Sequence, residues 1–341
     1  MPLFDGRLEV PLVGAPLAGG PSTPALAAAV SEAGALGFVA AGYKEPDEVA
    51  RELDEVRALT HRPFGVNVFF PVREPVDEDA VAAYAERLRP EAARYGVEPG
   101  EPRWSDDGWH AKLELLTREA PAVVSFTFGC AEREVVESLR RSGSAVWCTV
   151  TSVAEADAAS AAGVDALVVQ GCEAGGHQGF FLERGEEPLP LLELVRAVAR
   201  TTERPLVAAG GIATGAAAAA ALAAGASAAQ LGTAFLLAAE AATSQPHREA
   251  LRGERPTRLT RAFTGRRARG IVNRFMLDHD AVAPRGYPEI HSVTAPIRAA
   301  ARAAADGEAI NLWAGEAYAL AREATAGEIV ERLSAELRAA S

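Results

Sequence analysis

Features typical of nucleic-acid-binding or disulfide-rich proteins are scarce in this 341-residue chain. The formal net charge is -12 at pH 7 and lysine and arginine form no block, which argues against nucleic acid or an anionic membrane surface as the main partner. Only three cysteines occur, Cys130, Cys148 and Cys172, and no C-x-x-C pattern is present. Neither a disulfide framework nor a cysteine zinc site is therefore indicated. A small molecule is the expected partner.

Long apolar runs and a targeting segment are also missing. No uninterrupted apolar stretch approaches the roughly 20 residues that a membrane span needs. Residues 1–6 lack a basic region followed by an apolar one, so we expect a cytosolic protein that does not bind a membrane. The histidines have no metal-binding spacing such as H-E-x-x-H, and no metal site is predicted. No role is predicted for His61, His110, His247, His279 and His291.

What the chain does have is a recurring unit: a short apolar run, a turn and an alanine-rich amphipathic helix. Such alternation predicts parallel strands joined by right-handed crossovers. Eight units close naturally into a TIM (β/α)8 barrel, whereas the Gly-x-Gly-x-x-Gly turn typical of a doubly wound sheet is absent after the first strand. The predicted strands are 10–15, 37–41, 64–69, 122–126, 145–150, 166–169, 205–208 and 228–231. The predicted helices are 24–33, 46–59, 77–95, 132–142, 153–162, 189–199 and 215–224.

The recurring unit stops before the end of the chain. We therefore expect the barrel in residues 1–243, with a surface insertion near 96–108 where Pro99 and Pro102 break the pattern. Residues 244–341 are predicted to form a C-terminal, mainly helical appendage that packs on the barrel mouth. Within it, 257–276 looks irregular and arginine-rich, and helices are expected at 295–306 and 315–338.

The segment Gln170-Gly-Cys-Glu-Ala-Gly-Gly-His-Gln-Gly-Phe180 places one histidine among glycines directly after the sixth predicted strand. Loops at the C-terminal ends of barrel strands build the active site. Glycine lets the backbone approach a ligand closely, and histidine can move a proton near neutral pH. We therefore predict a functional role for His177.

Glycines also follow the last two predicted strands, at Gly210-Gly211 and at Gly232-Thr233. Turns at these positions of a barrel commonly bind phosphate, because free backbone N–H groups and the helix dipole favour an anion. The first strand ends in small residues with Pro16, which leaves room for a flat ring. The third strand ends with Asn67, a polar side chain that needs hydrogen-bond partners when buried.

At these positions the chain resembles the FMN-dependent nitronate monooxygenases, formerly called 2-nitropropane dioxygenases. The resemblance covers nearly the whole chain and is carried by residues 14–20, 65–69, 170–177, 209–213, 230–235, 263–270, 273–275 and 311–315. It implies a TIM barrel that binds FMN at its C-terminal face. The cofactor-binding residues that it implies are Ala15, Pro16, Leu17 and Ala18 along the flavin ring, Asn67 and Gln170 hydrogen-bonded to it, Gly175 and Gly176 nearby, and Gly210, Gly211, Gln230, Leu231, Gly232 and Thr233 at the phosphate.

The resemblance also implies a reaction. Alkyl nitronates, and nitroalkanes such as 2-nitropropane or the compound propionate 3-nitronate, would be oxidised by O₂ to a carbonyl compound and nitrite. His177 would orient and stabilise the nitronate, and could remove the α-proton of a neutral nitroalkane. Arg266, Arg267 and Arg269 could reach the flavin phosphate or a substrate carboxylate, or form a solvated face.

Two other functions stay open on the sequence alone. An FMN-dependent enoyl-acyl carrier protein reductase, or another NAD(P)H:acceptor oxidoreductase, would share the barrel, the phosphate turns and the Gly-Gly-His loop. A non-catalytic flavin-binding barrel would keep the pocket without the reaction. The natural substrate and the oligomeric state, including a homo-oligomer, are also left open.

Overall fold

Eight parallel strands form the centre of the molecule in the computed structural model, which describes residues 8–183, 185 and 187–340. The strand order is β1-β9-β8-β6-β5-β4-β3-β2, and a parallel bridge from Val13 to Leu36 joins the two ends. The sheet is therefore a nearly closed barrel, and the predicted TIM barrel is confirmed. The strands are β1 (Leu12–Gly14), β2 (Gly37–Ala40), β3 (Phe64–Phe69), β4 (Val123–Thr127), β5 (Ala145–Val150), β6 (Ala166–Gln170), β8 (Leu206–Ala209) and β9 (Ala228–Leu231).

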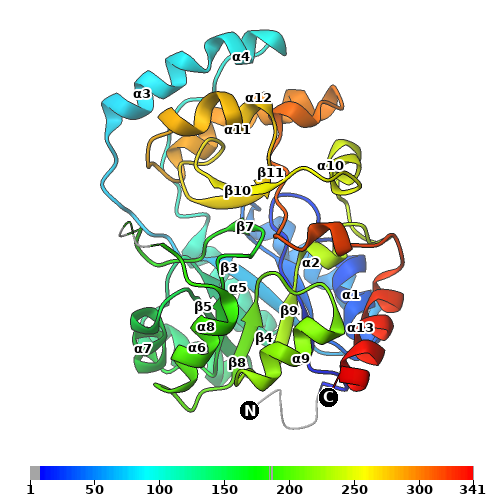
Figure 1. Ribbon diagram of the computed structural model, residues 1–341. Helices are drawn as coiled ribbons and strands as arrows, with labels where there is room; N and C mark the ends of the chain where they lie inside the picture. The colour runs from blue at the N-terminus through cyan, green and yellow to red at the C-terminus, as the bar shows by residue number, and fades with distance from the viewer. Residues whose placement is uncertain (1–7, 184, 186, 341) are drawn as a thin grey trace.

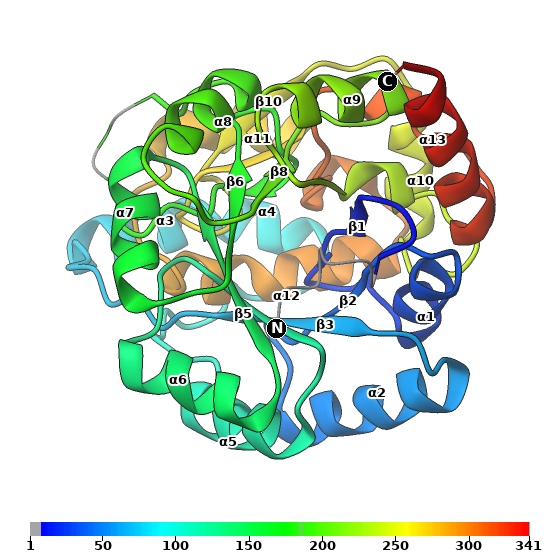
Figure 2. The same ribbon diagram turned by 90° about the horizontal axis from the view of Figure 1, so that it is seen from below.

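A ring of helices covers the outside of the barrel (Figures 1 and 2). Several begin at a side-chain cap: the hydroxyls of Thr23, Ser152 and Thr214 accept hydrogen bonds from the backbone N–H three residues later. The ring consists of α1 (Pro24–Glu32), α2 (Pro46–Leu59), α5 (Trp109–Glu119), α6 (Arg133–Ser142), α7 (Val153–Ala162), α8 (Leu191–Ala199), α9 (Gly215–Ala223) and α13 (Ala326–Ala340).

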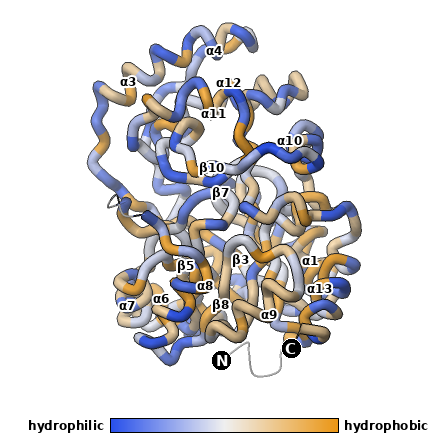
Figure 3. Tube along the Cα trace, in the orientation of Figure 1, coloured by the Kyte–Doolittle hydropathy of each residue, from blue (hydrophilic) through white to orange (hydrophobic). Residues whose placement is uncertain are grey.

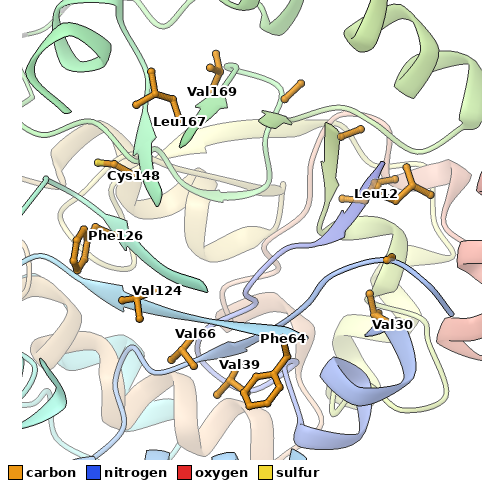
Figure 4. Close-up of a cluster of buried hydrophobic side chains, with 14 of the residues drawn as sticks. Leu12, Val30, Val39, Phe64, Val66, Val124, Phe126, Cys148, Leu167 and Val169 are labelled. Carbon is orange, nitrogen blue, oxygen red and sulfur yellow. The ribbon is translucent and has the colours of Figure 1, made fainter. Parts of the chain in front are cut away.

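Alternate strand residues belong to two different hydrophobic cores. On β5, Trp147 points into the barrel, while Val146 and Cys148 face the surrounding helices. Figure 4 shows the outward-facing set, to which Phe126 and Val169 belong. Because both faces of each strand are buried, the strands read as continuous apolar runs, which is why the sequence identified all of them. Figure 3 shows the resulting concentration of hydrophobic residues in the barrel half of the molecule.

A cap with its own hydrophobic core lies over the C-terminal ends of the strands (Figure 1). It contains a three-stranded antiparallel sheet of order β10-β11-β7. The cap elements are β7 (Gly176–His177), α3 (Glu78–Arg87), α4 (Arg89–Arg94), α10 (Gln245–Leu251), β10 (Thr257–Thr260), β11 (Ala268–Ile271), α11 (Arg274–His279) and α12 (Glu289–Ala303). Short 3-10 helices complete the chain at Thr233–Phe235, Asp280–Val282, Gly307–Ala309 and Tyr318–Leu320.

Four parts of the structure differ from the sequence prediction. The stretch 77–95 forms two helices, α3 and α4, which pack on α12 of the cap, and the ring position is filled instead by the unpredicted helix α5. Helix α5 has apolar residues at helical spacing, so its sequence did carry the signal. The stretch 257–276, expected to be irregular, contains β10 and β11, whose partners lie far away in the sequence. The helix expected at 315–338 begins only at Ala326.

The last helix, α13, also returns to the barrel. It packs between α9 and α1 in the ring, as Figure 2 shows. We keep the division of the chain after residue 243 as a proposal, with α13 assigned to the barrel and α3 and α4 to the cap. Residues 1–7, in which no targeting signal was found, lie outside the described residues. No described helix has the length and apolar character needed to cross a membrane.

The contact between β2 and α1 generates the first prediction. A Cβ added at Gly37 would lie 1.9 Å from the carbonyl oxygen of Ala27. Because the added methyl group would clash with the backbone of Ala27, we expect Gly37→Ala to lower the free energy of unfolding by about 3 kcal/mol. Gly327→Ala is the matched control, since its added Cβ would lie 4.0 Å from the nearest atom. Thermal unfolding followed by circular dichroism measures both; equal melting temperatures for the two variants would contradict the packing argument.

Candidate active site

A cavity of about 400 Å³ is enclosed between the strand ends and the cap. Its walls come from residues after β1, β3, β6, β8 and β9 and from α12 and the segment 310–317 of the cap. All but one of the predicted site residues line it, and these are Ala15, Pro16, Leu17, Ala18, Asn67, Gln170, Gly175, Gly176, His177, Gly210, Gly211, Gln230, Gly232 and Thr233.

Leu231 is the exception, because it does not line the cavity. The side chain is 1% exposed and belongs to the core between strands and helices. Its neighbour Gln230 points the other way because successive strand residues face opposite sides. Leu231 contributes instead through its carbonyl oxygen, which accepts a hydrogen bond of 2.8 Å from the N–H of Ala15.

The two glycine turns offer unused backbone donors. Gly210 and Gly211 have φ angles of +124° and +66°, a conformation that favours glycine. The N–H groups of Gly211, Ile212, Gly232 and Thr233 donate to no acceptor among the described residues. Helix α9 and the 3-10 helix Thr233–Phe235 begin at these turns. Free N–H groups at two adjoining helix starts form a site suited to an anion such as phosphate.

Two amides sit at the ends of β3 and β6. The Nδ2 of Asn67 donates to Ser125 and Thr127, at 2.8 Å to the first hydroxyl and 3.0 Å to the second. Its Oδ1 has no partner among the described residues and remains available to a ligand. Gln170 instead holds its own loop, because its Nε2 donates to the carbonyl oxygen of His177 and its Oε1 accepts from the N–H of Gly179.

His177 lies on β7, which pairs antiparallel with β11 at Ala268. Gly175 precedes it where no side chain fits, because an added Cβ would lie 2.5 Å from the N of Gly315. The accessible part of the imidazole faces the cavity, among the rings of Phe128 and Trp313. Burial, with the charges of two nearby arginines, lowers the pKa of His177 from 6.5 to about 3. The imidazole is therefore uncharged at neutral pH.

Thr264 determines which nitrogen of His177 carries the proton. The Thr264 hydroxyl lies 3.0 Å from Nε2 of His177 and 3.2 Å from the carbonyl oxygen of Arg266. That carbonyl has no other donor among the described residues, and a buried carbonyl without a partner is costly. If the hydroxyl donates to the carbonyl, it must accept from Nε2–H. Nδ1 is then the nitrogen that can accept a proton.

The cavity residues that the sequence prediction missed include Trp313 and Arg298 of the cap, and Tyr43 in the loop between β2 and α2. His247 and His291, for which no role was predicted, also line the cavity. They were missed because a lone histidine or arginine on a helix carries no local signal. For the segment 310–317 a signal existed, since residues 311–315 carry part of the family resemblance.

Arg266 and Arg267, in the turn before β11, and Arg269, on β11, do not line this cavity. The guanidinium of Arg266 lies 4.2 Å from the ring centroids of both Phe128 and Phe180. Arg267 and Arg269 form ion pairs with carboxylates. Of the alternatives left open for these arginines, neither a ligand contact nor a solvated face applies, since all three fasten the His177 loop to the cap.

Comparison with known proteins identifies the family. The nitronate monooxygenase family model matches residues 3–336. The chain belongs to the nitronate monooxygenase family. The members of this family are flavin-dependent oxidoreductases. A nitronate monooxygenase from Pseudomonas aeruginosa is 41% identical over an alignment of 345 residues, and the match covers 97% of this chain and 97% of its own. A probable nitronate monooxygenase from Staphylococcus aureus is 35% identical and covers 96% of this chain and 94% of its own.

Solved structures agree with this nitronate monooxygenase assignment. A nitroalkane oxidase from Streptomyces ansochromogenes superposes with a TM-score of 0.96 at 50% identity, over 98% of this chain and 97% of that one. FabK from Thermotoga maritima superposes less well, with a TM-score of 0.76 at 27% identity over 98% and 94%. The predicted family resemblance is confirmed, and the reductase alternative has less support.

The Thr264 contact generates the second prediction. Because its pKa is about 3, we expect His177 to stay neutral between about pH 5 and 8, with the proton on Nε2. Nitrogen-15 NMR of labelled histidine in the wild type tests this directly. Thr264→Val removes the acceptor and should raise the Nδ1–H fraction, whereas Thr264→Ser should behave like the wild type. A wild-type spectrum with the proton on Nδ1 would refute the assignment.

Proposed function

We propose that this protein oxidises alkyl nitronates with O₂, using FMN, and releases a carbonyl compound and nitrite. The observation that carries the proposal is the position of His177, whose imidazole contacts Thr264 on the wall of a glycine-lined cavity in a chain of the nitronate monooxygenase family. We further propose a cytoplasmic location, supported by the low number of cysteines and their spacing.

The described residues fit FMN as the flavin. Its phosphate would be held by the free N–H groups of Gly211, Ile212, Gly232 and Thr233, which offer an anion several donors. The amide of Asn67 would hydrogen-bond the flavin ring through its unused Oδ1. When bound there, the flavin would supply the electron-accepting chemistry that oxidises the nitronate.

The protein's own residues then bind and orient the substrate. The rings of Phe128 and Trp313 surround His177 and limit the access of water to the reacting carbon. A nitronate already has its α-proton removed, so no strong base is needed. For a neutral nitroalkane, Nδ1 of His177 is the acceptor that the Thr264 contact leaves free, and it would take the α-proton.

The second candidate function is an FMN-dependent enoyl reductase or another NAD(P)H oxidoreductase. The structural similarity to FabK supports it. A nucleotide-dependent enzyme would be reduced rapidly by NADH or NADPH without oxygen. We expect the flavin of this protein to stay oxidised under those conditions. A non-catalytic flavin-binding barrel would bind FMN fully and release no nitrite from any nitronate.

The third prediction concerns turnover. We expect His177→Ala to keep its FMN and to lose about 100-fold or more in kcat/KM for ethyl nitronate, since the group that orients the substrate is gone. Oxygen uptake and nitrite release measure the rate, with propionate 3-nitronate as a second substrate. His110→Ala, which changes an exposed histidine outside the cavity, is the control. Unchanged kinetics in His177→Ala would remove this residue from the mechanism.

The fourth prediction concerns the phosphate. Gly211→Asp and Gly211→Asn place side chains of nearly equal size at the same left-handed position, so they differ mainly in charge. A carboxylate beside the phosphate is repulsive, and we expect the aspartate variant to bind FMN about tenfold more weakly than the asparagine variant, or worse. Titration of the apoproteins with FMN, followed by flavin fluorescence, measures both affinities. Equal affinities would show that the phosphate lies elsewhere.

A further inference from the structure

Arg298 is a buried cation without a buried counter-charge. Its side chain comes from α12, is 8% exposed and lines the cavity. Among the ion pairs of the described residues, none involves Arg298, whereas the buried Arg269 pairs with Glu316 at 3.1 Å. Burial lowers the pKa of Arg298 to about 10, so the guanidinium stays charged at neutral pH.

The partners of Arg298 hold it in place but do not neutralise it. Its Nε donates to the Thr294 hydroxyl at 3.0 Å, and its Nη2 donates to the carbonyl oxygen of His291 at 2.9 Å. A longer contact of 3.5 Å joins Nη1 to Oδ1 of Asn311. Nη2 also lies 3.3 Å from Nδ1 of His291. All of these partners are uncharged. Burying a charge among neutral groups costs several kcal/mol, which a bound anion would offset.

The other arginines near the site differ from Arg298. Arg266 is also buried, but its guanidinium packs between two aromatic rings and does not line this cavity. Arg302, one helical turn after Arg298, lines the cavity but is exposed. Solvent therefore screens its charge, while the charge of Arg298 acts through a medium of low dielectric constant.

Arg298 and His177 are linked through His291 and the ring of Tyr287, whose centroid lies 5.5 Å from that of His177 and 6.5 Å from that of His291. The side chains of Arg298 and His177 line the same cavity, and His291, whose carbonyl oxygen accepts from Arg298, is stacked on Tyr43 with ring centroids 4.3 Å apart.

The positive charge of Arg298 contributes to the lowered pKa of both His177 and His291. Arg266 lowers the pKa of His177 as well, but it does not line the cavity. Among the described residues that line the cavity, Arg298 is therefore the buried positive charge.

We propose that Arg298 binds the negatively charged nitronate group of the substrate and makes the cavity select nitronates over neutral nitroalkanes of the same carbon skeleton. The two oxygens of a nitronate share one negative charge, as those of a carboxylate do, and the guanidinium is suited to such a group. This inference rests on the proposed function.

The fifth prediction uses a matched pair of substrates. For FMN-loaded Arg298→Met, we expect the KM for ethyl nitronate to rise about tenfold or more, while the KM for freshly dissolved nitroethane changes less than about twofold. Arg298→Lys keeps the charge and should lie between this variant and the wild type. Arg302→Met is the control, because it removes the same charge one turn away. Flavin content and melting temperature are measured for every variant.

Nitrate provides a second test, because its binding can be measured by calorimetry without turnover. It is a planar oxyanion with the charge of a nitronate, so it should bind wild-type holoenzyme in calorimetry and compete with ethyl nitronate. In Arg298→Met its affinity should fall about tenfold.

Several results would overturn the role of Arg298. These are absence of nitrate competition in the wild type, equal KM changes for both substrates, equal effects of Arg302→Met, or loss of FMN as the only defect of Arg298→Met. If the proposed function is wrong, the measurements give a different result from those that overturn the role of Arg298. In that case the wild-type enzyme oxidises no nitronate but binds nitrate in a manner that depends on Arg298. Such a result would support the anion site at Arg298 and refute nitronate oxidation.

Discussion

The pairing of β7 with β11 is the interaction on which the candidate site depends. It converts the glycine loop after β6 into part of the cap sheet, with His177 opposite Ala268. The same connection brings Thr264 within 3.0 Å of the imidazole. The barrel alone would leave the loop attached at its two ends only, and its histidine would be free to adopt many orientations. The antiparallel ladder removes that freedom before a ligand arrives.

The cavity uses two different physical means of attracting negative charge. At the strand ends, backbone N–H groups of the glycine turns provide partial positive charge that cannot be titrated. On the cap side, the full charge of Arg298 is held by neutral acceptors. The histidines add no charge at neutral pH, because burial lowers the pKa of His177 to about 3 and that of His291 to about 2. Their folded-state pKa values lie below 6.5, so acid favours the unfolded chain, and this loss of stability begins as the pH falls through about 6.5.

Features that are set by residues close together in the sequence could be predicted, whereas contacts between distant residues could not. The barrel strands and the place of His177 follow from apolar runs and the glycines after them, and Gly210 and Gly211 adopt the left-handed conformation that glycine favours. The roles of Thr264 and Arg298 depend on contacts across 87 residues of sequence in the first case and on the position of a helix in the second. No periodicity encodes such contacts. Helix α5 is a different failure, because its apolar residues have helical spacing and the predicted insertion ended at residue 108, directly before the helix begins.

The cap residues, and not the barrel, distinguish between the two reactions that a flavin enzyme of this fold could catalyse. The barrel, the glycine turns and a histidine after β6 would serve a flavin enzyme of either proposed kind, so they cannot by themselves separate a nitronate oxidase from a reductase. A reductase needs room for a nucleotide and a site for hydride transfer, whereas a nitronate oxidase needs a small cavity that holds an anion. A cavity of about 400 Å³, with a buried arginine on the same wall as a neutral imidazole, meets the second requirement more closely. The specificity of this enzyme is therefore best sought in α12 and the turn that carries Thr264, since these elements decide which charge and which proton acceptor the substrate meets.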